Sequence, residues 1–150
     1  LQKHPHLKGQ DIITTRKACE KFQFKPVSVM NFLEGTRFTP EKHQQQQSPF
    51  PYLLKPTAGG ISFVLNAMGQ RLDKLLDVTI YYPQGAPSFW DYISGKVHDI
   101  KVRVRVLPIE PELIGDYEDP HYRARFQQWV NQLWLDKNQQ LLELQQGESR

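Results

Sequence analysis

The sequence predicts an α/β fold, in which a mixed sheet is flanked by helices and followed by a long C-terminal helix. Three observations predict this class. Short runs rich in β-branched residues, each bounded by proline or glycine, are typical of strands. Between them lies an apolar run with the spacing of a buried helix, and residues 119–146 repeat large apolar side chains at helical intervals. The length of 150 residues and the hydrophobic content of 39% suit a single domain with a real core.

The first predicted elements lie before the middle of the chain. Asp11 or Thr14 can cap a helix that runs to about Phe22, because helix-forming residues follow both of them. Residues 26–33 carry two valines and a phenylalanine after a proline and are too short for an independent helix, so they predict a buried strand. The polar, proline-rich residues 38–56 predict a long excursion that serves as a lid or a spacer.

The middle of the chain alternates between helices and strands. Residues 58–68 predict a buried helix that ends at Gly69. Residues 76–82 predict a second strand, and residues 89–92 a short helix. Residues 98–106 alternate strictly between polar and apolar side chains, which predicts a strand with one buried face and one wet face.

The basic residues of the last predicted strand are open to two interpretations. Lys101, Arg103 and Arg105 alternate with valines, so they share the face opposite to the apolar one. Such a face is either a solvated edge of the sheet or a surface that meets lipid headgroups.

The final helix, over residues 119–146, is expected to begin at Asp119 and Pro120, because proline is favoured at the first position of a helix. Its apolar stripe is expected to pack against the core rather than to hold a cofactor. The stripe consists of Phe126, Trp129, Val130, Leu133 and Trp134.

The composition excludes several classes of protein. The apolar runs are far shorter than the roughly 20 residues that a membrane helix needs. The single cysteine, Cys19, excludes an internal disulfide and is expected to be a packing residue. The net charge of +3 is too modest to require an anionic partner, and no zinc-finger, homeodomain or RNA-recognition signature is present, so no nucleic-acid partner is expected.

A turn-forming segment follows the strand predicted over residues 26–33. Glu34, Gly35, Thr36 and Arg37 stand at the carboxyl end of that strand, the edge at which open α/β sheets hold ligands. Gly35 lets the backbone approach a ligand, and the planar guanidinium of Arg37 suits a phosphate or a carboxylate. The alternative is an exposed loop in which Glu34 and Arg37 pair with each other or with water.

A second cation lies at the far end of the excursion. Lys55 precedes Gly59 and Gly60 near the start of the helix predicted over residues 58–68, where backbone amides and a lysine can form a phosphate site. The alternative is an ordinary helix-initiating turn. Because Arg37 and Lys55 flank the same excursion, they are predicted to converge on one phosphate.

The residues His6 and Asp11 have the types of a catalytic base and its orienting acid. They lie in a terminal segment with Gly9 between them, where the pair cannot be held rigidly, and Asp11 is accounted for as a helix cap. The spacing is therefore interpreted as a coincidence. His4 and His6 lack further clustered ligands, so neither a metal site nor a catalytic residue is assigned within the chain.

Three segments resemble a known family in their order and spacing: NFLEGTRFTPEKH, LLKPTAGGISFVLNAMG and LLDVTIYYPQG. They are similar to the carboxyl-terminal half of the glycerolipid acyltransferases typified by bacterial 1-acyl-glycerol-3-phosphate acyltransferase, with the closest likeness to the YihG-type probable acyltransferases. The resemblance implies a partial glycerolphosphate-acyltransferase-like fold. Residues 1–150 would form the C-terminal part of a single acyltransferase domain, with residues 1–10 as a remnant of the upstream segment.

The resemblance implies transfer of a fatty acyl group from acyl-CoA or acyl-carrier protein to a lysophospholipid such as 1-acyl-glycerol-3-phosphate, with no further cofactor. Glu34, Gly35, Thr36 and Arg37 would help to bind the glycerol phosphate, together with Lys55. Glu34 would accept a hydrogen bond from the glycerol or fix Arg37, and Thr36 would donate to the phosphate or to its own turn. The family also implies the cytoplasmic side of the bacterial inner membrane, reached through an anchoring N-terminal segment, with the fragment itself soluble.

The sequence departs from the family pattern at the catalytic base. In the family, a histidine in an Asn-His-x-x-x-x-Asp box should lie several tens of residues before Glu34, whereas His6 is much closer and follows Pro5 instead of an asparagine. The chain is therefore expected to lack the base and to be inactive alone. The alternative function is a noncatalytic module that binds anionic lipid or another protein through the basic strand and the aromatic helix.

Overall fold

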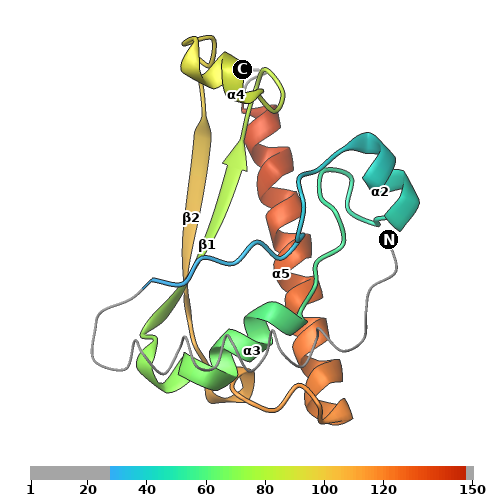
Figure 1. The fold of residues 1–150 in the computed structure, drawn as a ribbon, viewed down its shortest axis with the longest axis vertical. Helices are drawn as coiled ribbons and strands as arrows, with labels where there is room; N and C mark the ends of the chain where they lie inside the picture. The colour runs from blue at the N-terminus through green and yellow to red at the C-terminus, as the bar shows by residue number, and fades with distance from the viewer. Residues whose placement is uncertain (1–27, 148–150) are drawn as a thin grey trace.

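The computed structural model describes residues 28–147, and Figure 1 shows their arrangement. A hairpin of two strands stands beside one long helix, and a shorter helix lies across the lower end of the hairpin. The elements in chain order are α2 (Pro40–Gln46), α3 (Gly59–Met68), η1 (Gly69–Arg71), β1 (Lys74–Tyr81), α4 (Phe89–Ile93), β2 (Lys101–Pro108), η2 (Pro111–Leu113) and α5 (Pro120–Gln146). The helix predicted from Asp11 to Phe22 and the pair His6 and Asp11 lie outside the described residues.

The elements predicted after residue 57 are confirmed, with small shifts at their ends. The predicted helices over 58–68, 89–92 and 119–146 are α3, α4 and α5, and the predicted strands over 76–82 and 98–106 are β1 and β2. Gly69 is the C-terminal cap of α3, as predicted. α4 begins with a capping box, in which the side chains of Ser88 and Asp91 each accept a hydrogen bond from the other residue's backbone N–H.

The two strands form an antiparallel pair, in which Lys74 lies opposite Pro108 and Val78 lies opposite Val104. The mixed sheet predicted from the sequence is not found in the described part of the chain, which has this two-stranded sheet alone. A parallel pair needs a crossover that packs over the sheet. The connection between β1 and β2 instead carries α4, which lies at the end of the hairpin (Figure 1).

The strand predicted over residues 26–33 is wrong for the part that the structure describes. Residues 28–32 have no regular secondary structure, and Leu33 begins a turn. The backbone N–H and the hydroxyl of Thr57 both donate to the carbonyl of Leu33, at 2.8 Å each. A strand needs a neighbouring strand to satisfy its backbone, whereas the backbone at Leu33 is bonded to Thr57. Met30 and Phe32 are accordingly exposed, at 81% and 76%, whereas Leu33 is buried.

The two faces of β2 are the reverse of what the sequence predicted. The aliphatic side chains of β2, which were expected to be buried, point outward together with those of β1, and these side chains are 45–61% exposed. This outer face consists of Leu76, Val78, Ile80, Val102, Val104 and Val106. Arg103 and Arg105, which were expected to face water or lipid, contact acidic partners on β1 and α5.

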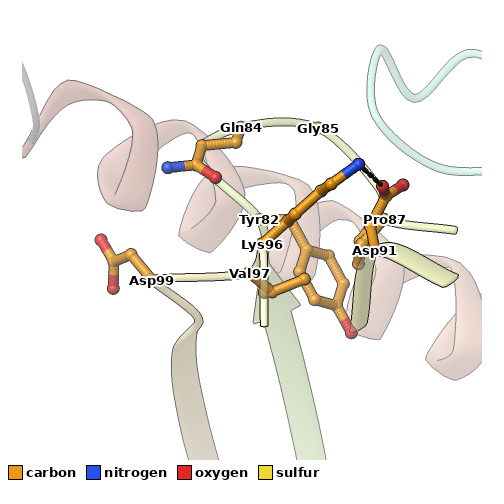
Figure 2. A pocket seen from close by; sticks show the side chains of 8 residues that line it. All are labelled: Tyr82, Gln84, Gly85, Pro87, Asp91, Lys96, Val97 and Asp99. Atoms are coloured by element: carbon orange, nitrogen blue, oxygen red, sulfur yellow. Dashed lines mark ion pairs between the residues drawn. The ribbon is translucent and has the colours of Figure 1, made fainter. Parts of the chain in front are cut away.

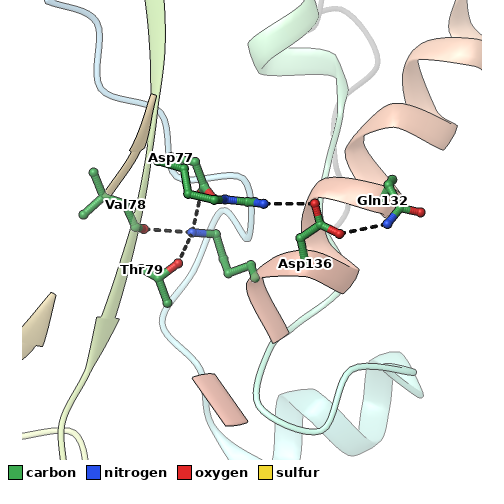
Figure 3. A network of polar contacts seen from close by, with 7 residues as sticks. Asp77, Val78, Thr79, Gln132 and Asp136 are labelled. Carbon is green, nitrogen blue, oxygen red and sulfur yellow. Dashed lines mark hydrogen bonds and ion pairs between the residues drawn. The ribbon is translucent and has the colours of Figure 1, made fainter. Parts of the chain in front are cut away.

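The reversal has an electrostatic cause, because α5 presents charged side chains that complement the strand. Arg105 donates to Asp77 on β1 at 2.7 Å and to Asp136 on α5 at 2.9 Å, and Arg103 pairs with Glu143 on α5. Lys137 pairs with Asp77. Figure 3 shows the part of this network around Asp77 and Asp136, between the sheet and the helix. Arg103 and Arg105 are therefore bound to carboxylates and do not form the free basic surface that the alternative function invoked.

The core lies where α5 meets α3 and the loops that precede α3. Phe126 and Val130 are 2% and 0% exposed and face a buried cluster from the other elements. The cluster includes Leu33, Phe50, Ala58, Ile61, Leu65, Leu113, Tyr122, Leu133 and Trp134. The indole N–H of Trp134 donates to the carbonyl of Leu54 at 3.0 Å, which satisfies a polar group in this cluster. The predicted packing role of the aromatic stripe is confirmed.

The excursion predicted over residues 38–56 is more ordered than a lid or spacer. It contains α2, whose first turn is capped by the hydroxyl of Thr39, which accepts from Lys42 N at 3.3 Å. Phe50 and Leu54 are 5% and 0% exposed, so the end of the excursion is part of the core. Across residues 28–147 no helix has both the length and the apolar character needed to cross a bilayer.

Candidate functional site

The predicted acceptor loop begins with a tight turn. The N–H of Gly35 donates to the carbonyl of Phe32 at 2.9 Å, and Gly35 has a φ of +66°, in the left-handed region. A side chain is disfavoured at this φ, although a Cβ there would meet nothing within 4 Å. The structure therefore requires glycine for the bend of the backbone, and the space beside the turn is open.

Glu34 turns away from this open side. Its Oε1 accepts from the backbone N–H of Leu54 at 3.2 Å, and its side chain is half-buried. Burial raises the pKa of Glu34, while the Leu54 N–H and the nearby Lys137 ammonium oppose that rise. The carboxylate thus ties the loop to the segment before α3. Among the described residues Glu34 makes no hydrogen bond or ion pair with Arg37, and its predicted contact with the glycerol stays a prediction.

Arg37 remains exposed, and its guanidinium has no hydrogen bond or ion pair among residues 28–147. The surface pair between Glu34 and Arg37, the ordinary alternative, is therefore not formed. Lys55 is also exposed and its ammonium has no partner in the same range, whereas its backbone N–H donates to Gln46 Oε1 at 3.0 Å. Two cations without a neutralising carboxylate thus flank the excursion.

The backbone segments that carry these two cations are held together. The hydrogen bond from Leu54 to Glu34 joins them on one side, and the two bonds from Thr57 to Leu33 join them on the other. Leu54, the residue before Lys55, is therefore fixed to the loop of residues 34–37. The structure brings the two segments together, while the convergence of the two side chains on one anion stays a prediction.

The structure adds one cation that sequence reasoning missed. Lys42, in the first turn of α2, donates from its ammonium to Thr36 Oγ1 at 2.6 Å and to the carbonyl of Arg37 at 3.3 Å. Thr36 thus accepts a hydrogen bond from Lys42, and its predicted donation to a phosphate or to its own turn stays a prediction. The Thr39-Pro40 helix start was the available signal, because it places residue 42 one turn from the loop.

A pocket of about 170 Å³ lies elsewhere, at the end of the hairpin, and Figure 2 shows its lining. It lies beside α4, and the ammonium of Lys96 pairs there with Asp91 at 3.7 Å. The volume is below the several hundred Å³ of typical ligand sites, and none of the predicted site residues line it. Among the described residues, no group of three histidine, cysteine or acidic side chains is placed to hold a metal.

The direction of the Glu34 pKa shift gives a testable result. Because the folded-state pKa lies above the ordinary value of 4.5, the stability due to the neutral carboxyl is present below that value and is lost as pH rises through the folded pKa. Glu34→Gln keeps an oxygen that can accept from Leu54 and removes the titration. We therefore expect the wild-type chain to lose stability relative to Glu34→Gln as pH increases from 4 to 7.

The measurement is urea unfolding followed by tryptophan fluorescence at several pH values. Glu41→Gln is the matched control, because the pKa of Glu41 is lowered by hydrogen bonds from its own backbone N–H and from Thr39. Its difference from wild type should change with the opposite sign. Parallel pH profiles for wild type and Glu34→Gln would contradict the inward, desolvated placement of Glu34.

Comparison with known proteins finds the same relative in three vertebrates. Lysocardiolipin acyltransferase 1 of Gallus gallus is 25% identical over 135 residues, which cover 82% of this chain and 34% of the relative. The protein of that name from Danio rerio is 26% identical over 129 residues, covering 78% and 31%. The protein from Mus musculus is 25% identical over 137 residues, covering 83% and 34%. No family model and no solved structure matches the chain.

These findings support the resemblance at a coarse level. The chain spans about a third of the length of the curated relatives that it matches. The closer likeness to YihG-type proteins, the assignment to a C-terminal half and the acyltransferase-like fold stay predictions. The chain is weakly similar, over most of its length, to acyltransferases of the glycerolipid acyltransferase family.

Proposed function

We propose that this chain holds part of the acceptor site of an acyltransferase that moves a fatty acyl group onto a lysophospholipid such as 1-acyl-glycerol-3-phosphate. The observation that carries the proposal is the exposed guanidinium of Arg37, which Glu34 does not neutralise because it bonds to Leu54. An unpaired guanidinium beside an open turn can bind a phosphate through two parallel hydrogen bonds. The weak similarity to lysocardiolipin acyltransferases supports the same class of substrate.

In this proposal the residues of the loop bind and orient the acceptor. Arg37 and Lys55 hold the phosphate, Gly35 keeps the backbone open beside it, and the proton of Thr36 is free to donate. A histidine from an upstream box takes the proton of the acceptor hydroxyl as the oxygen attacks the thioester carbonyl of acyl-CoA or acyl-carrier protein, and the thiolate leaves. The complete protein works on the cytoplasmic side of the bacterial inner membrane through an upstream anchoring segment.

Binding of the acceptor tests the proposal directly. Arg37→Ala is expected to weaken binding of 1-hexanoyl-lysophosphatidate by about 10- to 100-fold, because a charge-assisted hydrogen-bonded pair is lost. Isothermal titration of the 150-residue chain measures the dissociation constant. Arg71→Ala removes the guanidinium of another exposed arginine, in η1, and should leave the constant unchanged. If both variants lose the same affinity, the effect of Arg37 comes from the net charge of the chain, and the proposal of a site at Arg37 is wrong.

The catalytic part of the proposal needs a second experiment. With radiolabelled acyl-CoA and lysophosphatidate, the 150-residue chain should give no product, whereas a longer protein that carries the upstream Asn-His-x-x-x-x-Asp box should be active. Turnover by the 150 residues alone, abolished by His6→Ala, would assign the base to the pair that the sequence analysis set aside.

A further inference from the structure

We infer that Lys42 is a third phosphate-binding residue of this site and that it favours a phosphate monoester over a diester; the inference rests on the proposed acceptor site. Its ammonium lies 2.6 Å from Thr36 Oγ1 and 3.3 Å from the carbonyl oxygen of Arg37. These contacts put a full positive charge on the backbone of the residue whose side chain is the proposed phosphate ligand.

The ammonium of Lys42 keeps both its charge and a donor for a ligand. A lysine ammonium has three N–H donors, and two of them meet a hydroxyl and a carbonyl, which are neutral oxygens. Among residues 28–147 no carboxylate forms an ion pair with Lys42. The adjacent carboxylate of Glu41 is hydrogen-bonded at Thr39 instead. The third N–H is therefore free, on a side chain that is partly exposed.

The position of Lys42 is also fixed by its own helix. Its backbone N–H donates to the capping hydroxyl of Thr39, and the next residue, His43, donates to the carbonyl of Thr39 at 3.0 Å. The ring Nε2 of His43 contacts the carbonyl of Phe50 at 2.8 Å, and Phe50 is in the core. The first turn of α2 is thus anchored at both sides, so less conformational entropy is lost when Lys42 meets a ligand.

Counting charges gives the chemical class of the ligand. Arg37, Lys42 and Lys55 contribute three positive charges around one pair of joined loops, while Glu34 is turned inward. A phosphate monoester carries about −1.5 to −2 at pH 7, and a diester carries a single negative charge. Only the monoester carries a second negative charge with which the ammonium of Lys42 can interact. Its removal should therefore weaken the monoester more than the diester.

The test compares two ligands with the same acyl chain on four proteins. 1-Hexanoyl-lysophosphatidate is the monoester, and 1-hexanoyl-lysophosphatidylglycerol is the diester. The proteins are the 150-residue wild-type chain, Lys42→Gln, Lys42→Arg and Lys74→Gln. Lys74→Gln makes the same change in net charge at an exposed position on β1, a different element from the loop and the helix that carry the proposed site.

Lys42→Gln should weaken the monoester about tenfold and the diester about twofold, while Lys42→Arg restores the monoester to within about threefold of wild type. Lys74→Gln should change neither. Equal weakening of both ligands, with shifted amide resonances of Gly35 and Thr36, would mean that Lys42 only shapes the loop and would overturn the inference. A loss in Arg37→Ala without any in Lys42→Gln overturns the inference and leaves the proposed function standing. If the wild-type chain binds neither ligand, both the inference about Lys42 and the proposed acceptor site are wrong.

Discussion

Asp77→Ala is expected to destabilise the fold by about 3–5 kcal/mol, the cost of leaving buried charge without its partner. The carboxylate is 5% exposed and lies between the guanidinium of Arg105 and the ammonium of Lys137, which is 9% exposed. Lys137 would keep two neutral acceptors, the carbonyl of Val78 at 2.8 Å and the hydroxyl of Thr79 at 3.0 Å. Two cations would then face each other between the sheet and α5.

Urea unfolding followed by circular dichroism measures the loss, and a double variant separates charge from packing. Asp77→Leu combined with Lys137→Met replaces the pair with apolar side chains of similar size, which often costs little or stabilises. We expect the double variant to be at least 2 kcal/mol more stable than Asp77→Ala, on the order of the penalty for the unpaired charge. If both proteins unfold at the same urea concentration, the network does not hold the sheet to the helix.

Phe126→Ala is the second change with a large expected effect, a loss of about 3–5 kcal/mol from a cavity in the core. The side chain is 2% exposed. Its ring lies 5.5 Å from that of Tyr122 and 5.3 Å from that of Trp129, measured between centroids. A loss of this size is comparable with the whole stability of a small domain, so the variant is expected to be largely unfolded at 37 °C.

Thermal unfolding monitored by circular dichroism is the measurement. Leu135→Ala, on the same helix, is the control, because Leu135 is 54% exposed and leaves no cavity. It should stay within about 1 kcal/mol of wild type, as surface substitutions usually do. A midpoint for Phe126→Ala within a few degrees of that for Leu135→Ala would show that the core lies elsewhere.

The sequence was informative where structure depends on neighbours along the chain. The start of α5 is set by Asp119, which accepts from His121 N at 3.0 Å, and by the proline that follows. The alternation of β2 is equally local. Which face of β2 is buried depends on Asp136, 31 residues after Arg105, and no pattern within the strand contains that information. The pattern of β2 therefore predicted that its basic side chains face solvent, whereas Arg103 and Arg105 face the acidic side chains of α5.

The failed strand before Leu33 has a similar cause. Its composition is that of a strand, but a strand forms only beside a neighbouring strand, and the carbonyl of Leu33 is bonded to Thr57 in the loop before α3 instead. At the site, the residue types between Glu34 and Arg37 predict an anion site, and that stays a prediction. The inward turn of Glu34 depends on Leu54, 20 residues later, and the cation of Lys42 depends on where α2 begins. Both follow from loop contacts that residue types alone do not specify.

The outward aliphatic face of the hairpin affects any measurement of lysolipid binding to this chain. Lysolipids are surfactants, and above their micelle concentration they coat any nonpolar surface on a protein, here one that extends over both strands. The binding signal of a long-chain acceptor would therefore combine two contributions. One comes from adsorption on Val102, Val104 and Val106, and the other from binding at the loop beside Arg37. Ligands with six-carbon acyl chains, used below their micelle concentration, separate the two contributions. Val104→Thr is the control for adsorption on the aliphatic face.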